Sequence, residues 1–81
     1  MNILAKAERL ARAKQMAADG TARRIRLANR LAQRDIGLAV GVDTSTVARW
    51  ENGTRVPRGD AAWRYADLLA RLEQKAGPTD A

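Results

Sequence analysis

The side chains that could do chemistry in this chain are arginines and small hydroxyl residues. Lysine and arginine number fifteen against nine aspartates and glutamates, and the sequence contains no cysteine and no histidine. Histidine, the commonest general base, and cysteine, the thiol nucleophile, are therefore missing, and with them the usual zinc ligands. The sequence also shows no arrangement that places a nucleophile next to a base. We expect no catalytic residue, no metal site and no cofactor.

The positive charge is concentrated in the first part of the chain. Residues 1–58 hold twelve basic and five acidic side chains, whereas residues 59–81 hold three and four. Such an excess is typical of proteins that meet a polyanion. With three aromatic residues and no phenylalanine, the chain offers little for stacking on single strands or RNA. We therefore expect double-stranded DNA as the partner and no small-molecule substrate; a basic protein that is merely soluble is the alternative.

The segment 44–51, TSTVARWE, is the candidate for reading DNA bases. At helical spacing Val47 and Trp50 share one face, and the opposite face carries Thr44, Ser45, Ala48 and Arg49. Small side chains let a helix enter the major groove, and an arginine can bind guanine through two hydrogen bonds. We predict that these four residues read bases and that Thr46 contacts phosphate. Asp43 or Thr44 caps the helix, and Asp43 either accepts from a cytosine amino group or chiefly caps.

Two glycines set the geometry before that segment. Gly37 lies inside an expected helix that begins at Gln33, where a glycine costs about 1 kcal/mol relative to alanine. It is explained if another backbone passes very close, as where two helices cross. Gly41 supplies the positive φ of a tight turn, and Val42 fills the core behind it. Residues 33–53 therefore predict a helix, a turn and a second helix that stops at Gly53.

Arginines flank this unit on both sides. In the expected helix 22–30, Ile25 and Ala28 face the core, and the outer faces carry Arg23, Arg24, Arg26 and Arg30. This set suits phosphate contacts, or equally an exposed solvated face. After Gly53, a loop around Pro57 carries Thr54, Arg55 and Arg58, and such a loop suits phosphate contacts that fix register.

Longer helices are expected near both ends of the chain. Residues 61–76, capped by Asp60, place on one stripe Ala62, Tyr65, Ala66, Leu69 and Leu72. Trp63 and Leu68 lie off this stripe, and they either pack on the flank of the core or form a dimer contact.

Residues 2–18, capped by Asn2, form a helix with a thin stripe of Ile3, Ala7, Leu10 and Ala17, whose burial the sequence leaves open. This helix either packs on the core, contacts a partner or touches DNA. The turn signal Asp19-Gly20-Thr21, with Thr21 as a possible cap, is compatible with a full break or with a kink.

The expected fold is all-α, a compact bundle of about five helices. A DNA-binding domain at 21–76 follows a basic helical extension at 1–20 and precedes a frayed tail at 77–81. There is no apolar run of eighteen residues and no signal-peptide core, so we expect a cytoplasmic protein without a membrane partner.

Together these motifs resemble the lambda-repressor-like helix-turn-helix family of phage repressors, Cro proteins and xenobiotic-response-element regulators. The resemblance covers roughly residues 22–72 and rests on Gln33, Gly37, Val40-Gly41-Val42, Ser45-Thr46-Val47 and Trp50-Glu51-Asn52-Gly53 with Pro57. The segment RGDAAWRYADLLARL is similar to the closing helices of small actinobacterial and actinobacteriophage members. Gly37 stands where the family usually has alanine, and the long N-terminal helix is not part of the minimal family unit.

The resemblance implies further contacts and a function. Gln33 would touch phosphate and buttress the recognition helix, while Asn52, Gly53 and Arg55 would hold the DNA backbone. A Cro-like or small phage-type repressor would occupy an operator, as a homodimer at least on DNA, in the bacterial cytosol or nucleoid, or in the host cytosol if phage-encoded. The alternatives are an antitoxin that represses its own operon and a protein-interaction module that keeps the fold.

Overall fold

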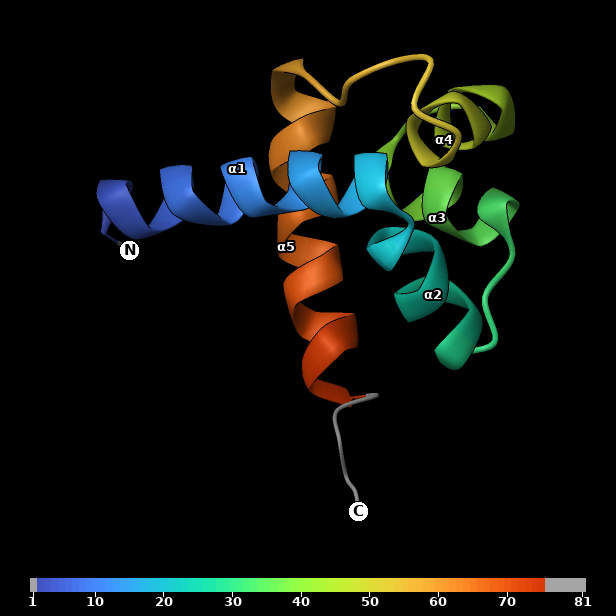
Figure 1. The fold of residues 1–81 in the computed structure, drawn as a ribbon, viewed down its shortest axis with the longest axis horizontal. Helices are drawn as coiled ribbons and strands as arrows, with labels where there is room; N and C mark the ends of the chain where they lie inside the picture. The colour runs from blue at the N-terminus through green and yellow to red at the C-terminus, as the bar shows by residue number, and fades with distance from the viewer. Residues whose placement is uncertain (1, 76–81) are drawn as a thin grey trace.

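The computed structural model describes residues 2–75, and these form five helices. The helices are α1 (Ile3–Asp19), α2 (Thr21–Ala28), α3 (Gln33–Val40), α4 (Thr44–Glu51) and α5 (Gly59–Lys75). In Figure 1, α5 runs as a column, α1 crosses it, and α2, α3 and α4 gather on one side. The prediction of an all-α bundle of about five helices is confirmed. The tail predicted at 77–81 lies outside the described residues.

A single hydrophobic core joins all five helices. Its buried residues are Ala13, Met16, Ala17, Ala22, Ile25, Ile36, Val40, Val47, Trp50, Tyr65, Ala66, Leu69 and Leu72. Trp50 of α4 packs on Tyr65 of α5 with ring centroids 4.7 Å apart, an aromatic contact that adds to the free energy of burial. The stripe predicted on the last helix is buried throughout its length. Helix α4 thus contacts α5 through this pair of rings.

Only the second half of α1 enters this core. Met16 is buried together with Ala13 and Ala17, whereas Ile3 is 78% exposed and Ala7 is exposed as well. The burial that the sequence leaves open is therefore limited to Ala17 and, in part, Leu10, and the first two positions of the stripe are exposed. The reason is geometric: α1 crosses α5 rather than running beside it, so its first turns extend past the column (Figure 1).

Polar contacts fix the course of α1. Asn2 caps the helix as predicted, its Oδ1 accepting from the Leu4 N–H at 2.8 Å. Further along, ion pairs join Arg9 to Asp67 and Arg12 to Glu73 on α5. The N-terminal helix is therefore fastened to α5 by charges as well as by buried side chains.

The junction between α1 and α2 is a complete break. Gly20 adopts a φ of 89°, and Thr21 is the first residue of α2. Asp19 Oδ1 accepts from the Thr21 N–H at 2.9 Å. The prediction that Thr21 caps this helix is wrong, because Thr21 lies inside the helix and its hydroxyl accepts from Arg24 instead.

The buried face of α2 differs from the predicted one. Ile25 is buried as expected, but Ala28 is exposed, and Arg26, expected on an outer face, is only 7% exposed. The predictions for Ala28 and Arg26 are therefore wrong. An arginine can occupy this face because a carboxylate of α4 lies opposite it, as described below.

The last helix begins at Gly59, two residues before the predicted start. Asp60 therefore lies in the first turn of α5 and is not its cap, so that prediction is wrong. A carboxylate in the first turn still interacts favourably with the helix dipole. Leu68 packs against the core, and half-buried Trp63 has the Lys6 Nζ 4.9 Å from its ring centroid.

Candidate nucleic-acid interface

A sharp turn joins α3 to α4. Gly41 has a φ of 82°, and its N–H donates to the Gly37 carbonyl at 2.8 Å, while the Val42 N–H donates to the same oxygen at 3.0 Å. The left-handed conformation predicted for Gly41 is confirmed. Partly buried Val42 packs against the core immediately after the turn.

Gly37 is a point of very close backbone approach. A Cβ atom placed on it would lie 2.6 Å from the Val42 carbonyl oxygen, closer than real Cβ atoms come to any neighbour. The prediction that another backbone passes here is confirmed, and the approaching segment is the turn that leads into α4. The missing side chain therefore lets the two helices of the motif meet at their observed angle.

Asp43 caps the recognition helix. Its Oδ1 accepts from the Thr46 N–H at 2.8 Å and from the Ser45 hydroxyl at 3.0 Å. These hydrogen bonds, with a smaller effect from the positive charge of Arg49, lower the pKa of Asp43. Of the two caps that the sequence allowed, the structure selects Asp43, and its carboxylate is ionised at neutral pH.

The two faces of α4 are divided as the sequence predicts. Val47 and Trp50 are buried. Thr44, Ser45 and Arg49 are exposed, and Ala48 and Thr46 are half-buried. The candidate base-reading residues thus form one accessible surface of small side chains with a single long arginine.

The segment after α4 is a compact turn. Asn52 Oδ1 accepts from the backbone N–H of Thr54 at 3.0 Å and from its hydroxyl at 2.7 Å, and Gly53 has a φ of 82°. The predicted left-handed stop at Gly53 is confirmed. This turn directs the following loop, which carries Arg55 and Arg58, back alongside α4.

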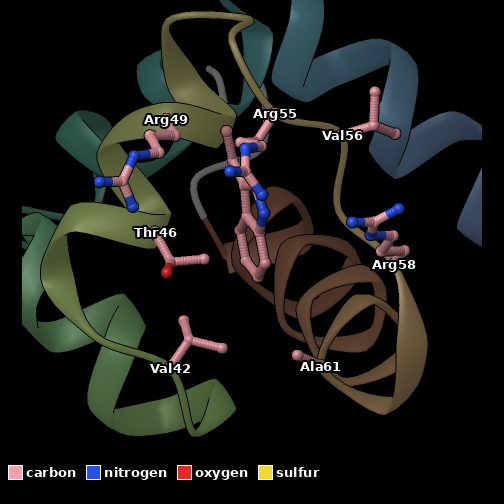
Figure 2. Close-up of a pocket in the computed structure, with 8 residues that line it drawn as sticks. Val42, Thr46, Arg49, Arg55, Val56, Arg58 and Ala61 are labelled. Carbon is pink, nitrogen blue, oxygen red and sulfur yellow. The ribbon is translucent and has the colours of Figure 1, made fainter.

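That loop and α4 enclose a hollow of about 180 Å³. Figure 2 shows Arg49 and Thr46 on the α4 side and Arg55, Val56 and Arg58 on the loop side, with Ala61 of α5 below. The structure therefore brings one candidate base reader together with three candidate phosphate ligands. A rim with three guanidinium groups suits the backbone of a duplex whose bases face α4.

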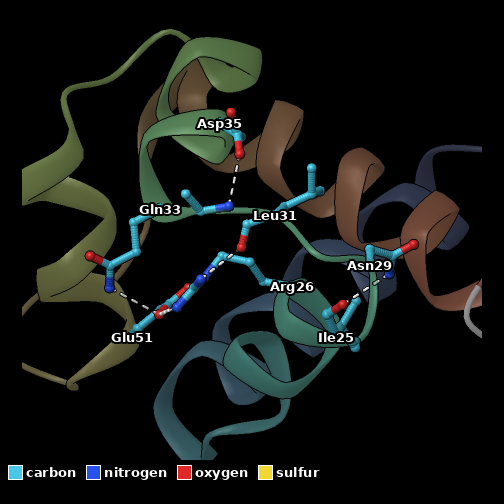
Figure 3. Close-up of polar contacts among 8 residues, drawn as sticks. Ile25, Arg26, Asn29, Leu31, Gln33, Asp35 and Glu51 are labelled. Carbon is cyan, nitrogen blue, oxygen red and sulfur yellow. Dashed lines mark hydrogen bonds and ion pairs between the residues drawn. The ribbon is translucent and has the colours of Figure 1, made fainter.

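The other candidate phosphate residues are distributed more widely. Arg23, Arg24 and Arg30 are exposed, but Arg24 folds back on its own helix, where its Nη2 donates to Thr21 Oγ1 at 3.1 Å. Arg30 lies between α2 and α3 with a φ of 59°. Beside it, the Asn29 side-chain amide donates to the Ile25 carbonyl at 2.9 Å (Figure 3) and to the Leu72 carbonyl at 3.2 Å.

A buried ion pair joins α2 to the end of α4, on the side of α4 that faces the core (Figure 3). Arg26 of α2 donates from Nε and Nη2 to the two carboxylate oxygens of Glu51, at 2.7 and 2.9 Å, and from Nη1 to the Leu31 carbonyl at 2.9 Å. Gln33, at the start of α3, donates to the same carboxylate at 3.1 Å. Glu51 is the last residue of α4, so this network fixes the end of the recognition helix to both preceding helices.

The network keeps Glu51 charged. Burial alone would raise the pKa of its carboxyl, but the hydrogen bonds from Arg26 and Gln33, with the charges of Arg26 and Arg23, together lower it below the ordinary value. The Arg26 pKa is raised by its hydrogen bond to Glu51. Gln33 thus contacts the recognition helix through Glu51, in the buttressing position that the resemblance implies.

Two supporting arginines are missing from the sequence-based site. The sequence predicts an outer face for Arg26 and no role for Arg64 of α5, whose Nε donates to the Val40 carbonyl at 2.8 Å. The Glu-Asn-Gly motif marks Glu51 as the carboxylate that ends a packed helix, but the sequence does not indicate which arginine lies opposite it. Nothing in the sequence pattern points to Arg64.

Neither a membrane-spanning helix nor a metal-binding cluster is found in the part of the chain that the structure describes. No helix among residues 2–75 is long and apolar enough to cross a membrane. The same residues contain no cluster of three or more acidic side chains that could hold a metal ion.

Comparison with known families agrees with this geometry. A family model described as helix-turn-helix matches residues 23–72, which is more than half of the chain and includes the whole of α3, the turn and α4. No curated protein and no solved structure gives a significant match. The matched region holds the glycine turn, the exposed face of α4 and the buried Arg26–Glu51 pair. The chain belongs to the lambda-repressor-like helix-turn-helix family of DNA-binding regulators.

Proposed function

We propose that the chain is a sequence-specific repressor of the Cro-like or small phage type, which acts by occupying an operator. The observation that carries this proposal is the accessible face of α4, where Thr44, Ser45 and Arg49 stand beside the arginines of the following loop. Base readers next to phosphate ligands are what sequence-specific binding in the major groove requires. Occupancy of a promoter by such a domain excludes polymerase or a rival repressor.

The proposed protein binds DNA as a homodimer on two half-sites about one helical turn apart. The candidate contacts are Trp63 and Leu68 on α5, together with the first turns of α1. Ile3 and Leu4 are 78% and 72% exposed there, although both are large and apolar. A second copy that covers these side chains would remove apolar surface from water and stabilise the complex.

Selection of bound sequences from a random pool of duplex DNA tests this proposal. We expect a palindromic consensus with half-sites spaced by one helical turn, and a steep fall of affinity for it as salt is raised. A single short site would contradict dimeric binding. Failure to enrich any sequence would contradict the repressor and favour a protein-interaction module.

A second candidate function is an antitoxin that represses its own operon. The exposed Ile3 and Leu4 on the free end of α1 favour it, because such a function needs an apolar surface for the toxin away from α4. The test is co-expression with the product of the neighbouring gene, followed by purification of the complex. A stable complex with that product would support the antitoxin, and its absence would favour the simple repressor.

A further inference from the structure

Arg64 reaches from α5 to the turn of the helix-turn-helix motif. Its Nε donates to the carbonyl of Val40, the last residue of α3, at 2.8 Å. Its guanidinium group also lies against Gly41, since a Cβ placed on that glycine would be 3.4 Å from Nη2. The last carbonyls of a helix lack intrahelical partners, and a cation there meets the negative end of the helix dipole. Arg64 therefore closes the end of α3 and covers the turn with one side chain.

This contact joins the turn of the motif to α5 outside the hydrophobic core. The core already joins α3 and α4 to α5 through buried residues that include Val40, Trp50 and Tyr65, the residue next to Arg64. The Arg64 contact adds a directional hydrogen bond at the turn itself, where apolar packing alone does not define the orientation. Residues 54–58, which carry the phosphate-binding candidates, lead directly into α5. Arg64 thus sets the position of α4 relative to that loop.

We infer that Arg64 is a positioning residue for base reading, acting through the turn at Val40 and Gly41 without touching a base. This inference rests on the proposed function. Bidentate base contacts need side chains held within about 0.5 Å of their productive geometry. Phosphate contacts made by long arginines tolerate larger displacements and do not depend on sequence. Loss of the contact therefore lowers the preference for the operator over random DNA, and not the affinity for DNA in general.

The test uses the full chain and measures dissociation constants for the selected operator and for a random duplex at several salt concentrations. Arg64→Met keeps the aliphatic stem and removes every donor. The matched control is Arg71→Met, which removes the same charge from the same exposed side of α5, where Arg64 and Arg71 line one surface hollow. Thermal unfolding of each variant shows that it is folded at the assay temperature.

For Arg64→Met we expect operator affinity to fall about three- to tenfold, the effect of one typical intramolecular hydrogen bond. Affinity for the random duplex stays within about twofold of wild type, and the salt slope on the operator is unchanged. Arg71→Met keeps the wild-type ratio of the two affinities. Arg64→Lys lowers the ratio too, because an ammonium group cannot lie flat over Gly41 as a planar guanidinium does.

Three results would overturn the inference. An equal loss on both duplexes with a salt slope reduced by about 0.9 would make Arg64 a direct phosphate ligand. An equal loss with an unchanged slope would mean that the variant only reduces the folded fraction. An unchanged ratio in both Arg64 variants would remove any positioning role. Failure of the wild-type chain to bind duplex DNA would refute the proposed function itself, before any variant is compared.

Discussion

Arg49 is the long side chain on the exposed face of α4, and it stands opposite the loop that carries Arg55. We expect Arg49→Ala to lose about 1–3 kcal/mol of operator affinity and to relax base preference at one position, because arginine bound to guanine through two hydrogen bonds is read directly. Arg55→Ala should weaken all sequences alike and flatten the salt dependence. Competition binding with operator variants measures both. Equal losses on operator and random DNA for the two variants would contradict this division of roles.

Arg30 is held in a left-handed conformation, with a φ of 59°, which a residue with a Cβ adopts at a cost of about 1–2 kcal/mol. Glycine removes that cost but increases the entropy of the unfolded chain. We therefore expect Arg30→Gly to be more stable than Arg30→Ala by roughly 1 kcal/mol, as measured by urea unfolding. Both variants should bind DNA equally weakly, since both lose the guanidinium. A difference in binding between them would mean that the conformation at residue 30, and not the charge, serves the interface.

Single residues were predictable where local geometry decides their role. A positive φ at Gly41 follows from the need for a tight turn, and the burial of Val47 and Trp50 follows from helical spacing. Arg26 was not predictable in this way, because its partner Glu51 lies 25 residues further along the chain. A charged residue is exposed by default, and only the tertiary fold shows that a second charge is buried beside it.

At the scale of helices, the Arg26–Glu51 pair joins α2 to α4. Glu51→Met leaves Arg26 buried without its carboxylate, which typically costs about 3–5 kcal/mol. The double variant Arg26→Met with Glu51→Met replaces the pair by apolar side chains, and we expect it to be far less destabilised than the single variant. Urea unfolding of the four proteins of the cycle gives the comparison. A double variant as unstable as the sum of its single changes would show that the pair is not coupled.

The same pair makes helix packing sensitive to acid. The pKa of Glu51 is lowered in the folded chain from an ordinary value of 4.5, so the stabilisation is fully present above pH 4.5 and is lost as the pH falls through the folded-state pKa. We expect the free energy of unfolding to decline below about pH 4.5. In Glu51→Gln, unfolding monitored by circular dichroism should show a shallower decline. An identical slope in both proteins would assign the acid sensitivity to other carboxylates.

The helices themselves were predictable to within a residue or two, because apolar periodicity and glycine stops mark them. The differences fall at helix starts, where the sequence predicts Thr21 and Asp60 as caps and the structure has both inside their helices, α2 and α5. Aspartate is favoured both at the cap and in the first turn, and a neighbouring glycine can begin the helix one or two residues earlier, so sequence alone does not fix the first residue. The hydrogen-bond network around Glu51 could not be predicted from the sequence, because Arg26 and Gln33 are distant from Glu51 along the chain.

For the whole molecule, the N-terminal helix is structural over its second half. Met16 is buried, so Met16→Ala should cost about 2–5 kcal/mol through lost burial and the cavity left behind. Leu4 on the same helix is 72% exposed, and Leu4→Ala should change stability by less than about 0.5 kcal/mol. Thermal and urea unfolding of the two variants test the difference. Equal effects would mean that α1 does not pack as described.

The bundle as a class was predictable, but the position of α1 within it was not. The alanine-rich stripe of this helix is compatible with packing on the core, with contact to a partner protein and with exposure to solvent. The outcome depends on where α5 lies and how far it reaches, which is a property of the assembled fold. Arg9 and Arg12, which could have been read as phosphate ligands, instead pair with Asp67 and Glu73.

The contacts between α1 and α5 also bear on how the chain is made. These ion pairs join residues 58 and 61 positions apart, so the first and last helices must find each other across nearly the whole sequence. Contacts of such separation slow folding relative to other small helical proteins. During synthesis α4 emerges well before α5, yet it is seated on Tyr65 and its turn is covered by Arg64. The exposed face of α4 therefore reaches its final position only after α5 has emerged and packed against it.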